Sequence, residues 1–172
     1  MAATDPRSVP TLVVTVSDRS ASGSRPDRSG PRLVELLTQA GHRVDGPLVI
    51  PDGADSVAAA LREAVAEGYR LVVTTGGTGV GPRDYTPEGT RQVLTRELDG
   101  VAEQLRREGA AHTPMAAISR GTAGVIDPAE GTGGGTLVVN LPGSVRAVEQ
   151  NLPALLPLVP HLLVQLDTGD HG

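Results

Sequence analysis

The sequence predicts an α/β protein built on a mainly parallel sheet, and two observations lead to this class. Short runs of β-branched and apolar residues alternate along the chain with stretches of helical periodicity. This order implies parallel strands joined by helices that cover both faces of the sheet. The apolar content is 38%, but aromatic residues contribute only 1%. A core of valine, leucine, isoleucine and alanine suits a sheet between helices, and 172 residues suffice for one such domain.

The first half of the chain alternates between strand and helix. The β-branched run at 11–16 predicts the first strand, and the apolar run at 71–75 predicts the third. Between them, the leucines of 31–40 share one helical face, and a glycine follows. The segment 43–50 is a weaker second strand because Gly-Pro interrupts it. Asp55 is expected to cap a helix whose apolar residues recur at every fourth position.

The second half continues with helices and a hairpin. Two helices and two strands are expected, at 87–96, 101–108, 121–127 and 136–141. The glycine-rich segment 128–135 would join the two strands as a flexible hairpin tip. A last helix starts at Ser144, and three later prolines are expected to kink or split it. The expected domain therefore covers 11–166, with a flexible lead-in at 1–10 and a flexible tail at 167–172.

Charge and composition exclude several classes of function. The net charge of −5 and the scarcity of aromatic side chains argue against nucleic-acid binding. Without cysteine, the chain has no disulfide, thiolate metal site or cysteine nucleophile. Without lysine, a Schiff base is excluded and arginine is the only strong cation. Neither a signal peptide nor a bilayer-spanning apolar run is apparent, so we expect no membrane contact and a cytoplasmic location.

The stretch from Leu71 to Glu88, LVVTTGGTGVGPRDYTPE, is the most informative in the chain. It holds four glycines within six residues, followed by Thr-Pro-Glu, which is typical of a helix start with a threonine N-cap. Glycines let backbone N–H groups approach a ligand closely, and that geometry favours anions. A P-loop is excluded because lysine is absent, and the glycine spacing does not fit a dinucleotide fingerprint. The alternative is a tight turn between strand and helix.

Four separate loops are expected to meet at one edge of the sheet, because ligands of parallel sheets bind beyond the carboxyl ends of the strands. These loops contain Ser17-Asp18-Arg19, Asp52, Gly76 to Asp84, and Pro142-Gly143-Ser144. Asp52 and Asp84 would face each other, and close carboxylates repel unless a cation or a proton joins them. Mg²⁺, which prefers a few carboxylates with phosphate oxygens and water, would bridge them. Alternatively, Asp52 caps the Pro-Asp-Gly turn and Asp84 caps the helix at Pro87.

Further loop residues offer contacts for an anion. Arginine pairs bidentately with phosphate, although a loop arginine can equally be solvated or bound to an acid. The loop arginines are Arg19, Arg25, Arg28, Arg83 and Arg120. Ser119 precedes a strand, where it would bind phosphate or cap a turn, and Asn140 and Ser144 flank a Pro-Gly turn. The four histidines show no spacing typical of metal ligands.

Together these motifs resemble the molybdenum-cofactor biosynthesis proteins of the MogA/MoaB type, which include molybdopterin adenylyltransferases and the G domain of gephyrin-like proteins. The resemblance covers about residues 11–166. It rests on Ser17 to Gly23 (SDRSASG), Pro51-Asp52, Thr74 to Glu88, Ser119-Arg120 and Asn140 to Ser144 (NLPGS). The combination of TTGGTG with PRDxTPE is highly specific. Tyr85, where a smaller residue is usual, and a long hairpin tip at 128–135 are departures.

The resemblance implies a three-layer α/β/α fold, a homotrimer, and transfer of AMP from ATP to the terminal phosphate of molybdopterin, with Mg²⁺ and release of pyrophosphate. It assigns catalysis and Mg²⁺ binding to Asp52 and Asp84. It maps the family's glycine-rich loop onto Gly76 to Gly79 and its functional serine onto Ser119, in agreement with the loops expected at one edge of the sheet. The candidate substrate-binding residues are therefore Ser17, Asp18, Arg19, Thr75, Gly76, Gly77, Thr78, Gly79, Ser119, Arg120, Asn140, Pro142, Gly143 and Ser144. Contact with the molybdenum insertase of the same pathway is also expected.

Two alternatives come from other classes of protein. One is a catalytically silent, MoaB-like protein that binds molybdopterin or serves as a scaffold. The other is a different nucleotide-cleaving enzyme on the same fold, as in CinA-like proteins.

Overall fold

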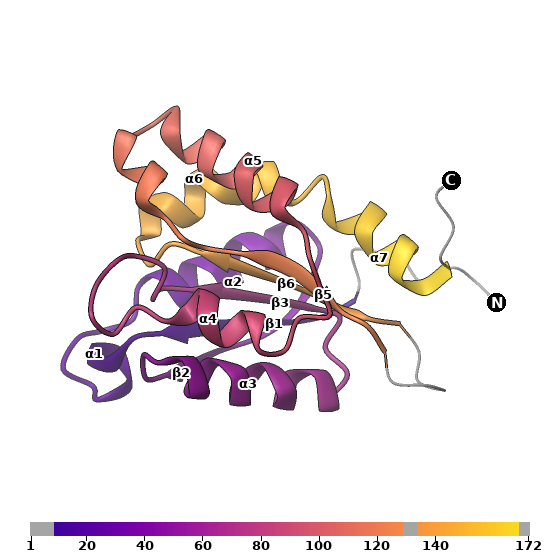
Figure 1. Cartoon of the computed structure of the whole chain (residues 1–172), viewed down its shortest axis with the longest axis horizontal. Coiled ribbons are helices and arrows are strands. Elements are labelled where there is room, and N and C mark those ends of the chain that lie inside the picture. Colours follow the sequence, from indigo (N-terminus) through magenta and orange to yellow (C-terminus); the bar gives the residue numbers. More distant parts are fainter. Residues whose placement is uncertain (1–8, 129–133, 169–172) are drawn as a thin grey trace.

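The computed structural model describes residues 9–128 and 134–168, and a six-stranded sheet with the order β2-β1-β3-β6-β5-β4 lies at its centre (Figure 1). The strands are β1 (Pro10–Val16), β2 (Arg43–Ile50), β3 (Leu71–Thr75), β4 (Arg96–Glu97), β5 (Ala123–Ile126) and β6 (Thr136–Leu141). Strands β2, β1, β3 and β6 are parallel neighbours, whereas β5 and β4 continue the sheet antiparallel. The predicted, mainly parallel sheet is therefore confirmed, with an antiparallel edge.

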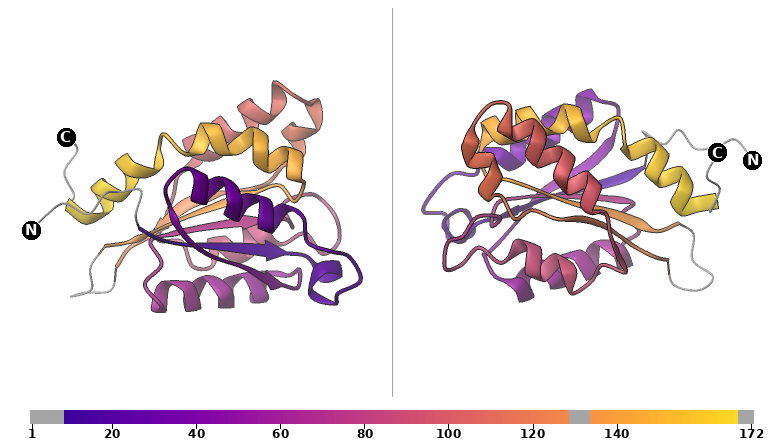
Figure 2. Two further views of the ribbon diagram at one scale, coloured as in Figure 1. Left: turned by 180° about the vertical axis from the view of Figure 1, so that it is seen from behind. Right: turned by 45° about the horizontal axis from the view of Figure 1, so that its top comes forward.

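Helices cover both faces of this sheet and complete the three layers (Figures 1 and 2). One face carries α2 (Ser29–Gln39), α5 (Asp99–Ala110), α6 (Val145–Leu155) and α7 (Val159–Thr168). The other face carries α3 (Ala54–Ala66) and α4 (Thr86–Arg91). Two short helices, α1 (Asp18–Ala21) and η2 (Pro114–Ile118), lie near the carboxyl ends of the parallel strands. The α/β class expected from the sequence is thus confirmed.

The two central strands β3 and β6 are buried along their whole length. Leu71 and Val73 pack in the core beneath α2, α5 and α6, whereas Val72 packs with Leu61 of α3. Parallel strands covered on both faces read as continuous apolar runs, because successive side chains enter opposite cores. This is why the sequence alone located β3 and β6.

The segment between α4 and α5 differs from the expectation. The helix predicted over 87–96 ends at Arg91, and the chain then forms the short strand β4. Edge pairing competes with helix here, because the Thr95 N–H donates to Val125 O at 2.9 Å and the Leu98 N–H donates to Ala123 O at 2.7 Å. The next helix begins at Asp99, two residues before the predicted start.

The start of α3 was also predicted incorrectly. Gly53, with φ of +127°, occupies the N-cap position, and Asp55 lies in the first helical turn. An acidic residue there still favours the helix through the positive end of the helix dipole. The predicted effect of the prolines is confirmed, since the last helical segment divides into α6 and α7.

The ends of the folded part lie slightly beyond the predicted limits. Val9 is buried and β1 begins at Pro10, while residues 1–8 lie outside the described residues. At the other end, Asp167 belongs to α7 and accepts a hydrogen bond from Arg70 at 2.5 Å. Most of the predicted hairpin tip, 129–133, and the last residues, 169–172, also fall outside the description. Within the described residues, none of the helices has the length and apolar character that a bilayer span requires.

Candidate functional site

The carboxyl ends of the parallel strands open onto a cavity with two lobes. The larger lobe has a volume of about 550 Å³ and the smaller about 390 Å³. The residues that line both lobes are Gly76, Gly77, Asp84, Gly143 and Ser144. The four loops that the sequence assigned to one edge of the sheet therefore meet there, as predicted.

Charged side chains line the larger lobe. Arg19, Arg25 and Arg28 come from the segment between β1 and α2, and Asp18 and Asp52 follow β1 and β2. Sequence reasoning noted Arg25 and Arg28 as loop arginines but did not include them among the site residues. Their position beside the glycine-rich loop depends on how the segment between β1 and α2 packs in the tertiary structure, which the sequence does not indicate. Several arginines around one cavity suit a ligand with several negative charges.

Apolar side chains line much of the smaller lobe. Met115 and Ile118 of η2 are 63% and 54% exposed, and both face this lobe together with Ala116. Ser119 lies at the end of the same short helix. No sequence pattern indicates these apolar residues, because a single 3₁₀ turn is too short for a periodic pattern. Exposed apolar groups in a concave wall suit a planar organic ring.

The wall between the lobes is built from glycines that other residues could not replace. Gly76 has φ of +102°, and a Cβ there would lie 2.3 Å from Val16 O. Gly77 has φ of +64°, and a Cβ on Gly143 would lie 3.0 Å from the Gly76 Cα. The left-handed conformations and these close approaches explain why the motif is rich in glycine.

Thr86 holds this wall in place, although the sequence predicted a different role for it. Its Oγ1 donates to Gly76 O at 2.9 Å, and its backbone N–H donates to Gly77 O at 3.0 Å. The expected threonine N-cap is therefore wrong: Thr86 is the first residue of α4, and Tyr85 occupies the N-cap position. The hydroxyl closes the glycine-rich loop instead of capping the helix.

Asp52 is half-buried and shares a reciprocal contact with Asp18. The Asp18 N–H donates to the Asp52 carboxylate at 2.7 Å, and the Asp52 N–H donates to the Asp18 carboxylate at 3.0 Å. Burial raises the pKa of Asp52; the Asp18 N–H opposes this change, while the charges of Asp18 and Asp84 add to it. The Asp52 carboxylate accepts its hydrogen bond from the Asp18 N–H, which belongs to another loop. Its contacts therefore do not match the alternative in which it caps the Pro-Asp-Gly turn.

Asp18 has a different environment, because Arg83 neutralises it. The Arg83 guanidinium donates to both Asp18 oxygens at 3.0 and 3.3 Å, and also to Asp52 O at 2.7 Å. The hydrogen bond from Arg83 lowers the pKa of Asp18. Arg83 therefore ties the glycine-rich loop to the loops that follow β1 and β2.

Asp84 lies where the two lobes meet. Its carboxylate accepts a hydrogen bond from the Gly81 N–H at 2.8 Å, within the glycine-rich loop. Helix α4 begins after Tyr85 without a side-chain cap. The contacts of Asp84 therefore do not match the alternative in which it caps this helix.

The remaining predicted site residues divide into two groups. Several line the cavity but also hold the backbone: Ser17 caps α1, Ser144 caps α6 and the Thr75 hydroxyl donates to Pro142 O at 2.9 Å. The residues that line the smaller lobe include Thr78, Gly79, Ser119 and Pro142. Within the part of the chain that the structure describes, the Ser119 hydroxyl accepts only a long bond of 3.4 Å from the Gly121 N–H, so it can turn toward a ligand.

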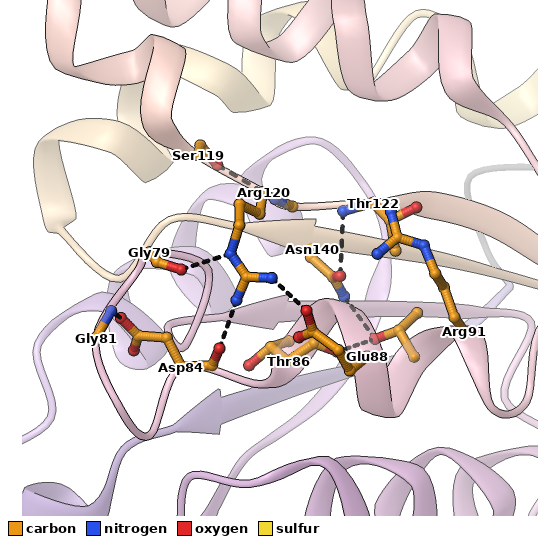
Figure 3. Close-up of polar contacts among 12 residues, drawn as sticks. Gly79, Gly81, Asp84, Thr86, Glu88, Arg91, Ser119, Arg120, Thr122 and Asn140 are labelled. Carbon is orange, nitrogen blue, oxygen red and sulfur yellow. Dashed lines mark hydrogen bonds and ion pairs between the residues drawn. The ribbon is translucent and has the colours of Figure 1, made fainter.

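Asn140 and Arg120 line neither of the two lobes. Figure 3 shows the polar contacts of both side chains. Asn140 is 3% exposed; its amide group donates to the hydroxyls of Thr74 and Thr90 at 3.0 Å each and accepts from the Thr122 N–H at 3.2 Å. These contacts give Asn140 a structural role in place of the direct substrate contact expected from the sequence.

The carboxylates suit a magnesium ion that is held mostly by other ligands. Among the described residues, no three His, Cys, Asp or Glu side chains converge as a complete metal site would. Burial is the main cause of the raised pKa of Asp52, and the nearby negative charges of Asp18 and Asp84 add to it, so a cation beside these carboxylates would be favourable. Mg²⁺ commonly binds one or two carboxylates and completes its shell with phosphate oxygens and water. Asp52 and Asp84 therefore fit Mg²⁺ only together with a phosphate ligand.

The fold and this edge define an α/β protein with a candidate site for an anionic ligand beyond the carboxyl ends of the parallel strands, where two carboxylates lie beside a glycine-rich loop. Residues 12–161 match the family described as "Probable molybdopterin binding domain". The chain belongs to this family.

Three similar proteins illustrate the match. The chain is 39% identical over 160 residues to a molybdenum cofactor biosynthesis bifunctional protein from Synechococcus elongatus; the match covers 93% of this chain but only 48% of that protein. It is 40% identical to a molybdopterin adenylyltransferase from Pyrococcus furiosus, over 88% of this chain and 87% of that protein. A crystal structure of a molybdopterin biosynthesis protein from Mycobacterium abscessus has a TM-score of 0.82 and 45% identity, over 92% and 96% of the two chains.

Proposed function

We propose that this protein is a molybdopterin adenylyltransferase, which transfers AMP from ATP to the terminal phosphate of molybdopterin. The observation that carries the proposal is that Asp52 and Asp84 meet the glycine-rich loop at one two-lobed cavity. A protein that only binds the pterin needs the loop, whereas paired carboxylates beside it suit a reaction between two phosphates. Similarity along most of the length of the P. furiosus adenylyltransferase supports the same reading.

The chemistry of the two lobes suggests where each substrate binds. The larger lobe, with Arg19, Arg25 and Arg28, suits the triphosphate of ATP. The smaller lobe, with Met115 and Ile118, suits the planar pterin. The terminal phosphate of molybdopterin would then lie where the smaller lobe meets the shared wall, so that glycine N–H groups of the wall and Ser119 of the smaller lobe can donate to it.

The reaction joins one phosphate to another. An oxygen of the terminal molybdopterin phosphate attacks the α-phosphorus of ATP. The bond from the α-phosphorus to the oxygen that bridges the β-phosphorus breaks, and pyrophosphate leaves with the electron pair. Since both partners are anions, positioning and charge neutralisation dominate catalysis.

The residues of this chain divide that task. The glycine-rich loop orients the attacking phosphate, and the arginines of the larger lobe hold the departing pyrophosphate. Asp52 and Asp84 would hold Mg²⁺, which supplies neutralisation of the phosphate oxygens when bound.

One assay separates this proposal from its alternatives. Purified protein is incubated with Mg²⁺ and ATP, with and without molybdopterin, and pyrophosphate is measured. An adenylyltransferase releases pyrophosphate only when molybdopterin is present. A silent binding protein releases none in either case, and a nucleotide-cleaving enzyme releases it from ATP alone; either outcome overturns the proposal.

The proposal includes the setting in which the protein acts. We propose a homotrimer in the cytoplasm that contacts the molybdenum insertase of the same pathway, with one domain over about residues 11–166. The relative from S. elongatus is described as bifunctional, and this chain matches only about half of it. This supports the proposal that the protein acts beside a second activity of the same pathway. The family resemblance supports the trimer.

A further inference from the structure

The Arg120 side chain contacts the glycine-rich loop and the start of α4 (Figure 3). Its Nε donates to Gly79 O at 2.7 Å, one Nη donates to Asp84 O at 2.5 Å, and the other Nη pairs with Glu88. Its backbone N–H also donates to Thr78 O at 2.8 Å. One planar guanidinium thus engages both ends of the segment 79–84 and an acid on the following helix.

The two halves of the loop depend on different anchors. Gly76 and Gly77 are held by Thr86, and the Gly76 N–H also donates to Leu141 O at 3.1 Å. The segment 79–84 instead turns on its own local bonds, in which the Gly81 N–H donates to Asp84 and the Asp84 N–H donates to Gly81 O at 3.1 Å. Arg83, within this turn, contacts Asp18 and Asp52 through its side chain, and Arg120 connects the turn to the rest of the fold through the carbonyls at its two ends.

Glu88 anchors the Arg120 guanidinium through an ion pair. Glu88 lies in the first turn of α4, and its side chain and that of Arg120 are 38% and 35% exposed. A partly desolvated ion pair of this kind is stronger than a fully exposed one. Helix α4 is itself held to the sheet, because the buried Asn140 amide donates to the Thr90 hydroxyl at 3.0 Å. The chain of contacts therefore runs from the sheet through α4 and Arg120 to the loop.

We propose that Arg120, anchored by Glu88, is a positioning residue that fixes the backbone of segment 79–84 and thereby holds the Asp84 carboxylate between the two lobes. Arginine is required because its planar fork reaches two carbonyls and a carboxylate at once, which a lysine ammonium cannot do. The kinetic consequence rests on the proposed adenylyl transfer, whereas the structural consequence does not.

The kinetic test compares single and double variants. Arg120→Met should lower kcat at least about tenfold through misplacement of Asp84. The KM for molybdopterin should change by no more than about threefold, because Thr86 still holds Gly76 and Gly77. Asp84→Asn combined with Arg120→Met should be little slower than Asp84→Asn alone, since both act through one carboxylate. Multiplication of the two single effects would overturn the proposal.

The second test uses hydrogen exchange and needs no activity. In Arg120→Met, the amides of Gly81 and Asp84 should exchange at least about tenfold faster, while Gly76 and Thr86 keep their protection. Exchange at the wild-type rate across segment 79–84 would overturn the proposal. If the wild-type protein transfers no AMP, the proposed function fails, and exchange alone decides the role of Arg120.

Three further variants separate geometry from charge and folding. Arg120→Lys keeps the charge but not the fork, so it should resemble Arg120→Met; full activity in this variant would overturn the requirement for the fork. Glu88→Gln should loosen the same segment to a smaller degree, even if Arg120→Met folds poorly. Arg91→Met is the matched control, because Arg91 lies on α4, the helix of Glu88, and pairs with Glu97 at the surface. This variant should match the wild-type protein in both tests.

Discussion

Three aspartates gather at the carboxyl edge of the sheet, and their partners give them different roles. Asp18 is paired with Arg83 on both oxygens, so its charge is already compensated. Asp52 and Asp84 accept backbone N–H groups instead. A carboxylate that accepts only from neutral donors keeps its full charge for a cation. These contacts favour Asp52 and Asp84, and not Asp18, as the pair that serves the reaction.

Asp84→Asn should keep the fold and most molybdopterin binding but lower AMP transfer by at least about a hundredfold, the scale expected for loss of one electrostatic stabiliser. Single-turnover transfer across a Mg²⁺ titration measures this effect. Asp52→Asn should act in the same direction, and the double variant should be little worse than the worse single variant, because both residues would serve one metal.

The matched control for these variants is Asp55→Asn, an exposed residue of α3 outside both lobes. It should transfer AMP at the wild-type rate. Wild-type transfer by Asp84→Asn at every Mg²⁺ concentration would remove this carboxylate from the reaction.

Asp52→Asn should also make the protein more stable at neutral pH. Burial is the largest cause that raises the pKa of Asp52 above its ordinary value of 3.8. The folded state therefore binds the proton more tightly than the unfolded chain does. The charge therefore costs stability once the pH rises through the folded pKa, and that cost is absent below the unfolded pKa. Denaturant midpoints should be higher for the variant at pH 7, and the gap should shrink toward pH 4. A lower midpoint at pH 7 would contradict the assigned desolvation.

At the scale of elements, the glycine-rich loop is positioned by its neighbours more than by its own strand and helix. Thr86 closes its first half, Arg120 holds its second half, and Arg83 connects it to the loops after β1 and β2. A loop with several glycines has high conformational entropy when free, so a precise anion site needs such external contacts. The loop and helix α4 are therefore one functional unit.

Gly77→Val should abolish molybdopterin binding. A side chain at this position would adopt a φ of +64°, and its Cβ would lie 2.2 Å from the Thr86 Oγ1. The substitution therefore displaces the hydroxyl that holds the loop as well as filling the anion site. Thr78→Ser is the mild comparison, since the Thr78 contact with Arg120 uses the backbone carbonyl. Equal molybdopterin affinity of Gly77→Val and wild-type protein, measured by calorimetry, would remove the loop from the site.

Asn140→Ala should destabilise the fold without changing substrate affinity. Its amide links β6 to the hydroxyls of Thr74 on β3 and Thr90 on α4. Loss of a buried partner that leaves unpaired polar groups costs about 1–3 kcal/mol of unfolding free energy. Chemical denaturation measures that loss. Unchanged stability with weaker molybdopterin binding would restore the direct contact that the sequence suggested.

At the scale of the whole molecule, the sheet separates two cores, and both depend on aliphatic side chains. The parallel strands end at the same edge, so the loops that carry charge are presented together, at the opposite side of the sheet from helix α7 (Figure 1). A rigid scaffold with a loop-built site at one edge is typical of doubly wound α/β proteins.

The assembly prediction belongs to this scale. We expect a homotrimer, with a mass of 52.8 kDa as three times the chain mass of 17.6 kDa. The reason is the resemblance to MogA/MoaB-type proteins. Multi-angle light scattering at micromolar concentration measures the mass, and a value near that of one chain would contradict the trimer.

The sequence by itself determined the class of the fold, the edge of the site and the family. Continuous apolar runs such as 71–75 occur where a strand is buried on both faces, and four glycines in six residues occur where the backbone must approach a neighbour closely. Both are local requirements, so local patterns reveal them. The pair Asp52 and Asp84 followed from the rule that parallel strands end at one edge.

Only the tertiary structure decided which polar residues face the cavity and which support it. Arg120 and Asn140 were predicted to contact the substrates, yet their side chains are engaged by Glu88, Thr74 and Thr90. The strand at Arg96–Glu97 replaced a predicted helix because β5 pairs with it. Each of these outcomes depends on a partner that is distant in the chain, and no local pattern of residues specifies which partner a side chain will meet.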